Sequence, residues 1–120
     1  MKKRTTIRQV KEGGIYAIEV DNEIIYIGST SRPFQIRFEE HREGIETYSN
    51  HLSLYQQMTD YERENYKFKI LVDVEEAKYS NKPSKLNNYD LQWMELGFIM
   101  AFKPKYNVAG LLTNYIFKLW

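Results

Sequence analysis

Residues 14–30, with the sequence GIYAIEVDNEIIYIGST, decide the fold of this chain. β-Branched and aromatic residues recur on both sides of Asp21-Asn22, and this pattern around two turn-forming residues is typical of a β-hairpin. Side chains alternate between the two faces of a strand, so Tyr16 and Tyr26 can share one face of the hairpin. Aromatic residues in strands are usually structural, and a core role is the alternative for both tyrosines. The stretch predicts two strands, at 14–20 and 23–29.

The rest of the chain predicts helices and one further strand. Ser31 and Pro33 mark the start of a first helix, which we expect to run to about Glu43 and to stop at Gly44. The alternating sequence YKFKILV predicts a third strand at 66–72. The remaining expected features are a helix at about 52–61, a loop at 79–85, a helix at about 88–102, and a helix stop at Lys103-Pro104.

Composition indicates a single globular domain inside the cell. The chain has 120 residues, 42% of them hydrophobic, and it lacks cysteine, which excludes disulfides and thiolate metal sites. No apolar run follows the basic start MKKR, and none approaches the roughly 18 residues of a membrane span. We therefore expect a cytoplasmic protein with no membrane partner. The formal net charge is only +1, so affinity for nucleic acid would need positive charge gathered on one face, or a partner.

The chain divides into three parts. Residues 1–12 are basic and polar and form an N-terminal arm, and residues 13–110 form the domain. Residues 111–120 are an apolar C-terminal extension, which we expect to pack on the domain or to lie at an interface.

Arg37 and His41 are candidate site residues on the first predicted helix. They lie four positions apart and therefore project from one face. An arginine offers two parallel donors to phosphate oxygens and keeps its charge, and a nearby imidazole can accept a proton. Glu40 and Arg42 show that this helix is charged throughout, so a solvated face is the alternative interpretation.

Glu95 is the third candidate, on the last predicted helix. It shares a face with four large apolar residues, Leu91, Phe98, Ile99 and Phe102. A carboxylate in an apolar stripe is costly unless it is compensated, and Mg²⁺ or Mn²⁺ is a suitable partner because hard cations take oxygen ligands. A place at the rim of the stripe or a salt bridge to Arg37 are alternatives that the residues leave open.

Taken together, these features resemble the GIY-YIG nuclease family. The resemblance spans about four-fifths of the chain and rests on Gly14-Ile15-Tyr16, Tyr26-Ile27-Gly28, Arg37 with His41, Glu95, and the KPKYN sequence that ends at Asn107. It implies an α/β fold of the α+β type, in which a small three-stranded antiparallel sheet is flanked by helices. It also implies that a catalytic site is lined by Tyr16, Tyr26, Arg37, His41 and Glu95, with Asn107 and Gly28 in support.

The activity implied by the resemblance is metal-dependent hydrolysis of phosphodiester bonds in nucleic acid, with DNA favoured over RNA as the substrate. Glu95 would hold Mg²⁺ or Mn²⁺, Arg37 would neutralise charge on the phosphate oxygens, and a tyrosine would deprotonate the attacking water. Free tyrosine has a pKa of about 10, so roughly one molecule in a thousand is phenolate at pH 7. The site must lower that pKa or pass the proton to His41. Tyr16 is the preferred base, with Tyr26 as the alternative.

The chain departs from the family pattern in several places. Tyr48 or His51 stands where some members carry another histidine, and both are candidates for a supporting role. Ser29 stands where certain members have a lysine. Members usually attach this domain to a separate DNA-binding or partner domain, so a targeting partner is expected, and residues 111–120 are the first candidate for homodimerisation.

Two further alternatives complete these expectations. Association with the nucleoid, or an origin in a phage, is an alternative to the simple cytoplasmic location. A catalytically silent module of the same fold, binding nucleic acid or protein, stands beside the nuclease.

Overall fold

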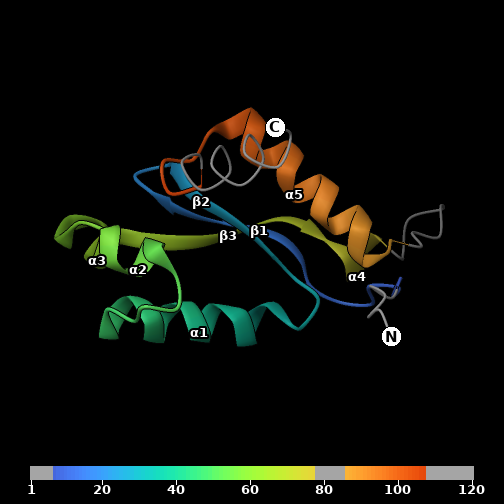
Figure 1. Ribbon diagram of the computed structural model, residues 1–120, viewed down its shortest axis with the longest axis horizontal. Coiled ribbons are helices and arrows are strands. Elements are labelled where there is room, and N and C mark those ends of the chain that lie inside the picture. Colours follow the sequence, from blue (N-terminus) through green and yellow to red (C-terminus); the bar gives the residue numbers. More distant parts are fainter. Residues whose placement is uncertain (1–6, 78–85, 108–120) are drawn as a thin grey trace, which may run out of the picture.

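A central sheet separates two layers of helices, as Figure 1 shows. The computed structural model describes residues 7–77 and 86–107. The predicted loop at 79–85, the predicted extension at 111–120 and the first six residues of the N-terminal arm lie outside the described residues.

The sheet has three antiparallel strands in the order β2-β1-β3: β1 (Gly14–Val20), β2 (Glu23–Thr30) and β3 (Tyr66–Asp73). This confirms the predicted α+β class and all three predicted strands, to within one residue at their ends. Asp21 and Asn22 form the turn between β1 and β2 with φ of 52° and 65°, as a tight hairpin turn requires of both central residues. β1 is therefore buried at the centre, and β2 is left as an edge strand.

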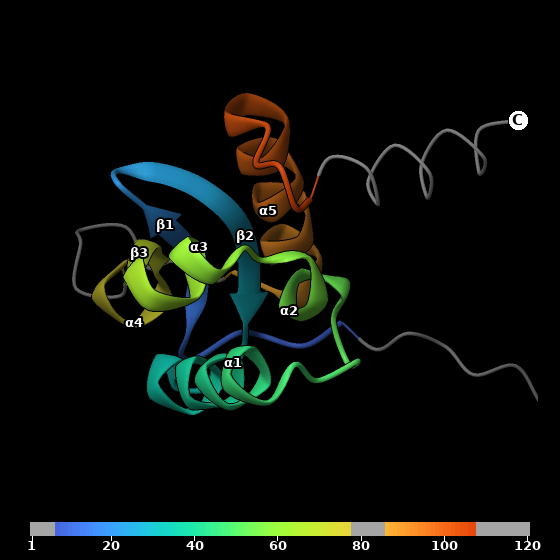
Figure 2. The ribbon, with the colours of Figure 1, turned by 90° about the vertical axis from the view of Figure 1, so that its left-hand side faces the viewer.

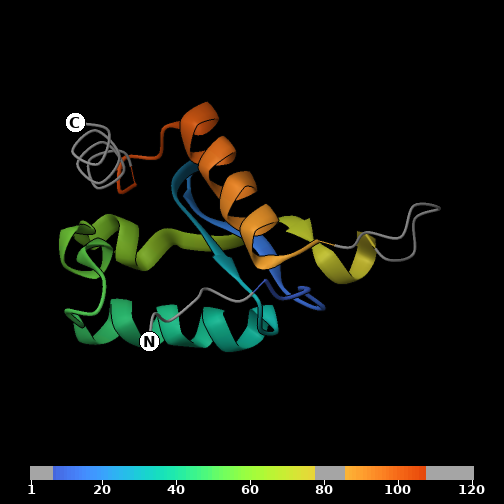
Figure 3. The ribbon, with the colours of Figure 1, turned by 45° about the vertical axis from the view of Figure 1, so that its right-hand side comes forward.

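The helices lie on both faces of the sheet, as the turned views in Figures 2 and 3 show. α1 (Phe34–Thr47) and the short α2 (Ser53–Gln57) pack on one face, and α5 (Asn88–Phe102) packs on the other. The predicted alternation along β1 is confirmed, because Ile18 and Val20 belong to the cluster on the α1 side while Ala17 belongs to the cluster on the α5 side.

The first helix is longer than predicted. Pro33, not Ser31, occupies the N-cap position, and no side chain caps the helix there. The helix passes through Gly44 and ends at Tyr48, whose left-handed backbone (φ 54°) allows its N–H to bond the Gly44 carbonyl. Gly44 is not a stop signal because it lies under the ring of Tyr55, where a Cβ would come within 2.3 Å of a ring carbon.

The single helix predicted at 52–61 is wrong. The chain instead forms α2 and a separate helix, α3 (Asp60–Asn65), with a break at Met58 and Thr59. Thr59 and Glu62 cap each other's backbone N–H groups in a capping box, and this local arrangement starts a new helix. A further short helix, α4 (Val74–Ala77), follows β3 directly and was not predicted.

The predicted helix at 88–102 is confirmed as α5, which Asn87 and Asp90 cap at its start. Within the predicted apolar stripe, Leu91 and Ile99 are buried, but Phe102 is 52% exposed and stacks on Phe98 instead of entering the core. The helix ends at Lys103 in a left-handed conformation (φ 49°), and Pro104 follows as predicted.

The described end of the N-terminal arm is built into the domain. Gln9 forms a β-bridge with Asn87, and the N–H of Val10 bonds the carbonyl of Leu86. Val10 is buried in the core on the α5 side. This segment therefore holds the start of α5 against the sheet.

Candidate active site

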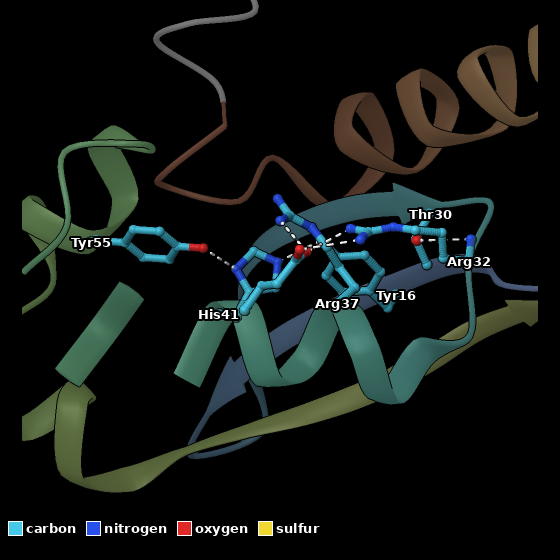
Figure 4. Close-up of polar contacts among 7 residues, drawn as sticks. Tyr16, Thr30, Arg32, Arg37, His41 and Tyr55 are labelled. Carbon is cyan, nitrogen blue, oxygen red and sulfur yellow. Dashed lines mark hydrogen bonds and ion pairs between the residues drawn. The ribbon is translucent and has the colours of Figure 1, made fainter. Parts of the chain in front are cut away.

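Three of the predicted site residues meet on the α1 face of the sheet, as Figure 4 shows. The hydroxyl of Tyr16 lies 2.5 Å from Nε2 of His41, and Nε of Arg37 donates a hydrogen bond to the same hydroxyl at 3.3 Å. Tyr16 comes from the central strand, whereas Arg37 and His41 come from successive turns of α1, so the predicted i, i+4 pair does converge on the tyrosine.

Gly28 makes room for this arrangement. It is paired directly with Tyr16 across β1 and β2, and a Cβ at this position would lie 2.5 Å from the tyrosine hydroxyl oxygen. Any side chain larger than hydrogen would therefore push Tyr16 away from His41. The second glycine of the hairpin has a steric role in the site.

Tyr26 lies on the same face, with its ring centroid 5.7 Å from that of His41. Burial raises the pKa of Tyr26 to about 12, and the Glu95 carboxylate adds to this rise while Arg37 opposes it. Burial also raises the pKa of Tyr16 above its usual range, with Tyr26 adding to the rise and Arg37 again opposing it. Both tyrosines therefore hold their protons at neutral pH in the ligand-free protein.

His41 is fully buried, with 0% of its surface exposed. Burial and the nearby Arg37 lower its pKa to about 3, so the imidazole is neutral at physiological pH. Its second nitrogen, Nδ1, lies 2.8 Å from the hydroxyl of Tyr55 on α2. The imidazole thus stands between two phenol hydroxyls.

Tyr55 is the residue that sequence reasoning missed. It is 14 positions from His41 and lies on a different helix, so no local spacing joins the two. The available signal is Gly44, a glycine inside α1 at the point where the Tyr55 ring crosses that helix. A mid-helix glycine that does not end its helix indicates close approach of another group.

Arg37 also forms an ion pair. Its Nη1 lies 3.0 Å from Glu40, and Arg32 donates two hydrogen bonds to the same carboxylate at 2.6 and 3.2 Å. These hydrogen bonds lower the pKa of Glu40 to about 2. Two guanidinium groups therefore hold one anion at the surface of the site.

Glu95 approaches from the other side of the sheet. Its carboxylate accepts a hydrogen bond of 2.8 Å from Ser29 on the edge strand β2, and not from Arg37. Burial raises the pKa of Glu95, and the bond from Ser29 opposes the rise. The charge of Glu95 in turn contributes to the raised pKa of Tyr26 and, less strongly, to that of Tyr16.

The other three supporting candidates, Asn107, Tyr48 and His51, lie in different places. Asn107 accepts a bond from the backbone N–H of Ile27 at 2.8 Å and donates one to its carbonyl at 2.9 Å, which ties the segment after α5 to β2. Tyr48 is 56% exposed and stacks under the guanidinium of Arg63, away from Tyr16. His51 is exposed and lines a surface hollow that Arg37 and Tyr55 also line.

This hollow lies along α1 and has a volume of about 560 Å³. Glu43 and Thr47 of α1 line one side, and Ser49 and Leu52 line the other. Arg37 and Tyr55, which contact Tyr16 and His41, are among the residues that line it.

Glu95 is the candidate metal ligand of this site. Within residues 7–77 and 86–107, no three or more histidine, aspartate or glutamate side chains are grouped as metal ligands. A cage made only of protein ligands is therefore not built from the described residues. Mg²⁺ is commonly held by one or two carboxylates together with waters and substrate phosphates, and Glu95 can supply one carboxylate of this kind.

Comparisons of the chain with protein-family models, with curated proteins and with solved structures found no match. In the part of the chain that the structure describes, no helix combines the length and the apolar character needed to cross a lipid bilayer.

Proposed function

We propose that this chain is a metal-dependent endonuclease with the GIY-YIG fold, and that it hydrolyses phosphodiester bonds in DNA. The observation that carries the proposal is the convergence of Tyr16, Arg37 and His41 on the α1 face of the sheet, together with the Glu95 carboxylate, whose charge raises the pKa of the tyrosine. A base, a phosphate-binding cation and a carboxylate are the groups that phosphodiester hydrolysis needs.

Arg37 is the residue that would bind the scissile phosphate. Its guanidinium is only partly exposed and already holds an anion, the carboxylate of Glu40. Charge-assisted bonds from a guanidinium suit phosphate and carboxylate oxygens alike, so a phosphate can take the place of Glu40. Glu40 is partly exposed at 42% of its side chain, and an ion pair of this kind is weak enough to exchange.

Tyr16 is the residue that would deprotonate the attacking water. Its neighbour Arg37 works against the rise in its pKa, and its hydroxyl is in contact with the one side chain that can take its proton, His41. The proton can leave Tyr16 along the 2.5 Å contact to Nε2, which makes the oxygen basic toward the water.

Glu95 is the residue that would hold Mg²⁺ or Mn²⁺, and such an ion, when bound, supplies polarisation of the phosphate and stabilisation of the leaving 3′-oxygen. Ser29 holds the Glu95 carboxylate by one oxygen, Oε1. The hydrogen bond fixes the direction from which the carboxylate can accept a further partner.

The proposal is tested by incubating the full chain with supercoiled plasmid and Mg²⁺ or Mn²⁺, with EDTA in a parallel reaction. Glu95→Ala is expected to abolish nicking and to leave the fold intact, because Glu95 is only half-buried. Glu75→Ala is the matched control, since it removes the same group from an exposed position on α4. Equal nicking by the Glu95 and Glu75 variants would contradict the metal-site assignment.

A catalytically silent module that binds nucleic acid or protein is the second candidate, and the contact between Glu40 and Arg37 favours it because the phosphate-binding arginine already holds a carboxylate. A carboxylate on the central arginine lowers the positive field that the site presents to DNA, in a chain of net charge +1. This candidate predicts that the folded wild-type protein leaves a labelled duplex uncut at every metal concentration.

A further inference from the structure

The imidazole of His41 gives its hydrogen-bonded chain a direction. A neutral imidazole has one N–H donor and one acceptor nitrogen. Because Nε2 meets Tyr16 and Nδ1 meets Tyr55, one of these hydroxyls must donate to the ring and the other must accept from it. Two arrangements exist, and they differ in where the protons lie.

The contacts of Tyr16 select one arrangement. The Tyr16 oxygen already accepts a bond from Nε of Arg37. If Nε2–H of His41 donated to it as well, the Tyr16 proton would have no acceptor among the described side chains in the ligand-free protein. Among the described residues, the hydrogen bonds of this hydroxyl are those to Arg37 and His41. Tyr16 therefore donates to Nε2, and Nδ1–H donates to Tyr55.

Tyr55 can then donate its own proton outward. Its hydroxyl accepts from Nδ1, and Tyr55 is one of the residues that line the hollow along α1. That hollow is large enough for several waters at the roughly 30 Å³ that each occupies in the liquid. Each member of the series then donates to the next, from Tyr16 through His41 and Tyr55 to solvent.

We propose that Tyr55 is a positioning residue that completes a proton relay from Tyr16 through His41 to the hollow along α1. In the relay, the O–H bond of Tyr16 breaks as Nε2–H forms, and Nδ1–H breaks as a new O–H forms on Tyr55. The former Tyr55 proton passes to a water in the hollow. Tyr16 is left as the phenolate that takes a proton from the attacking water. This inference rests on the proposed nuclease function, which supplies that water.

A relay of this kind avoids a charged imidazole. His41 is surrounded by aromatic rings and by a guanidinium, and burial keeps its pKa far below that of free histidine. The titratable or charged groups that act on it come from β1, β2, α1 and α2, and they are Tyr16, Tyr26, Arg37, Glu40 and Tyr55. A proton that entered at Nε2 and stayed would place a positive charge beside Arg37. Release of Nδ1–H to Tyr55 removes that cost.

The surroundings hold Tyr55 in this place. Gly44 leaves space for its ring against α1, since a Cβ there would lie 2.3 Å from it. Arg63 donates hydrogen bonds to the backbone carbonyls of Tyr55 and Ile45, which ties α2 to the end of α1. Packing on Gly44 and the hydrogen bond from Arg63 therefore hold the Tyr55 hydroxyl at His41, and neither contact involves a ring nitrogen of His41.

The first test reads the protonation of His41 directly, by ¹⁵N NMR of the full chain labelled at histidine. The chain has two histidines, and His51 is exposed, so the buried His41 is readily assigned. The relay predicts a neutral ring protonated at Nδ1. In Tyr55→Phe the acceptor is lost, and the ring is expected to become protonated at Nε2, facing Tyr16. A wild-type ring protonated at Nε2, or an identical tautomer in both proteins, would overturn the relay.

The second test uses cleavage kinetics. Tyr55→Phe is expected to lower kcat about tenfold or more and to leave KM unchanged, as for loss of part of a general base. Tyr61→Phe is the matched control, because it removes an exposed hydroxyl that bonds Asp21 far along the chain. A kcat equal to that of wild type would overturn the role of Tyr55. If wild type itself does not cleave, the nuclease proposal fails, and the NMR result still decides the hydrogen-bonded chain.

Discussion

The two faces of the sheet are built from different chemistry. On the α5 side the buried cluster is aliphatic and includes Ile15, Ala17, Ile27, Leu91 and Ile99. On the α1 side, aromatic rings make edge-to-face and stacked contacts, and two tyrosine hydroxyls bond the two ring nitrogens of His41. These rings are Tyr16, Phe38, His41, Tyr55 and Phe68.

This contrast separates the face that stabilises the fold from the face that fixes the positions of the site atoms. An aliphatic cluster tolerates exchange of similar side chains, because its contacts are non-directional. A buried polar network is stable only while every donor and acceptor in it is satisfied. The α5 face therefore supplies stability, and the α1 face fixes particular atoms at particular distances.

The largest effect is expected where the α1 face loses its central hydroxyl. Tyr16→Phe should lower the cleavage rate by about 10²–10⁴-fold, the usual contribution of a general base. Its free energy of unfolding should fall by only about 1–2 kcal/mol, from the lost partner of His41. Plasmid nicking and urea denaturation measure the two effects. Retention of wild-type activity would assign the base to Tyr26.

A comparable change on the α5 face should lower the free energy of unfolding and leave the cleavage rate unchanged. Leu91→Ala removes a buried side chain that is 4% exposed, and it should lower the free energy of unfolding by about 2–4 kcal/mol. Cleavage per folded molecule should stay at the wild-type value, with Leu91→Met as the volume-conserving control. A loss of cleavage in a fully folded Leu91 variant would mean that the two faces are coupled.

Acid should weaken the α1 face first. The pKa of His41 is lowered to about 3 in the folded protein and is about 6.5 unfolded, so the unfolded state binds the extra proton between these values. Stability from this group is complete above pH 6.5 and is lost as the pH falls toward 3. Between pH 6.5 and 5 the loss should be about 1–2 kcal/mol.

The pH effect is measured as the difference between wild type and His41→Gln in urea denaturation at several pH values. Carboxylates with lowered pKa, such as Glu40, titrate below this window and do not interfere. Parallel curves for the two proteins would show that His41 is not held neutral by burial.

The smallest effect is expected at the surface of the α1 face. Glu40→Gln removes the carboxylate that occupies Arg37 and Arg32, so affinity for a short DNA duplex should rise several-fold, or less than about 1 kcal/mol. Glu39→Gln is the matched control, because it makes the same charge change one residue away and releases only Arg42. Fluorescence anisotropy without metal measures both variants, and equal affinities would assign the rise to net charge alone.

The sequence predicted most of the sheet and the main helices because their patterns are local. Alternation predicted β1, β2 and β3, and turn chemistry predicted the hairpin at Asp21 and Asn22. Predictions failed where one residue type serves two purposes. Gly44 was predicted to end the first helix, but it lies inside that helix and leaves room for the ring of Tyr55. The apolar spacing at 52–61 predicted one helix, but the capping box at Thr59 starts a second one.

The candidate site was predictable to the extent that its members are near one another in the chain or on one periodic element. Arg37 and His41 share a helix face by spacing alone, and Tyr16 and Tyr26 share a strand face. Tyr48 was a candidate by position, yet its ring turns to Arg63 because the left-handed end of α1 directs it outward.

By itself, the sequence determined the elements, the two faces of β1, and which side chains could carry acid–base or phosphate chemistry. These follow from backbone periodicity and side-chain type, which act over a few residues. The tertiary structure was needed to place Tyr55 at the second nitrogen of His41. It also decided that Glu95 approaches the tyrosines from the opposite layer. Such contacts depend on how separate elements cross in space, and burial of the groups where they cross sets their protonation.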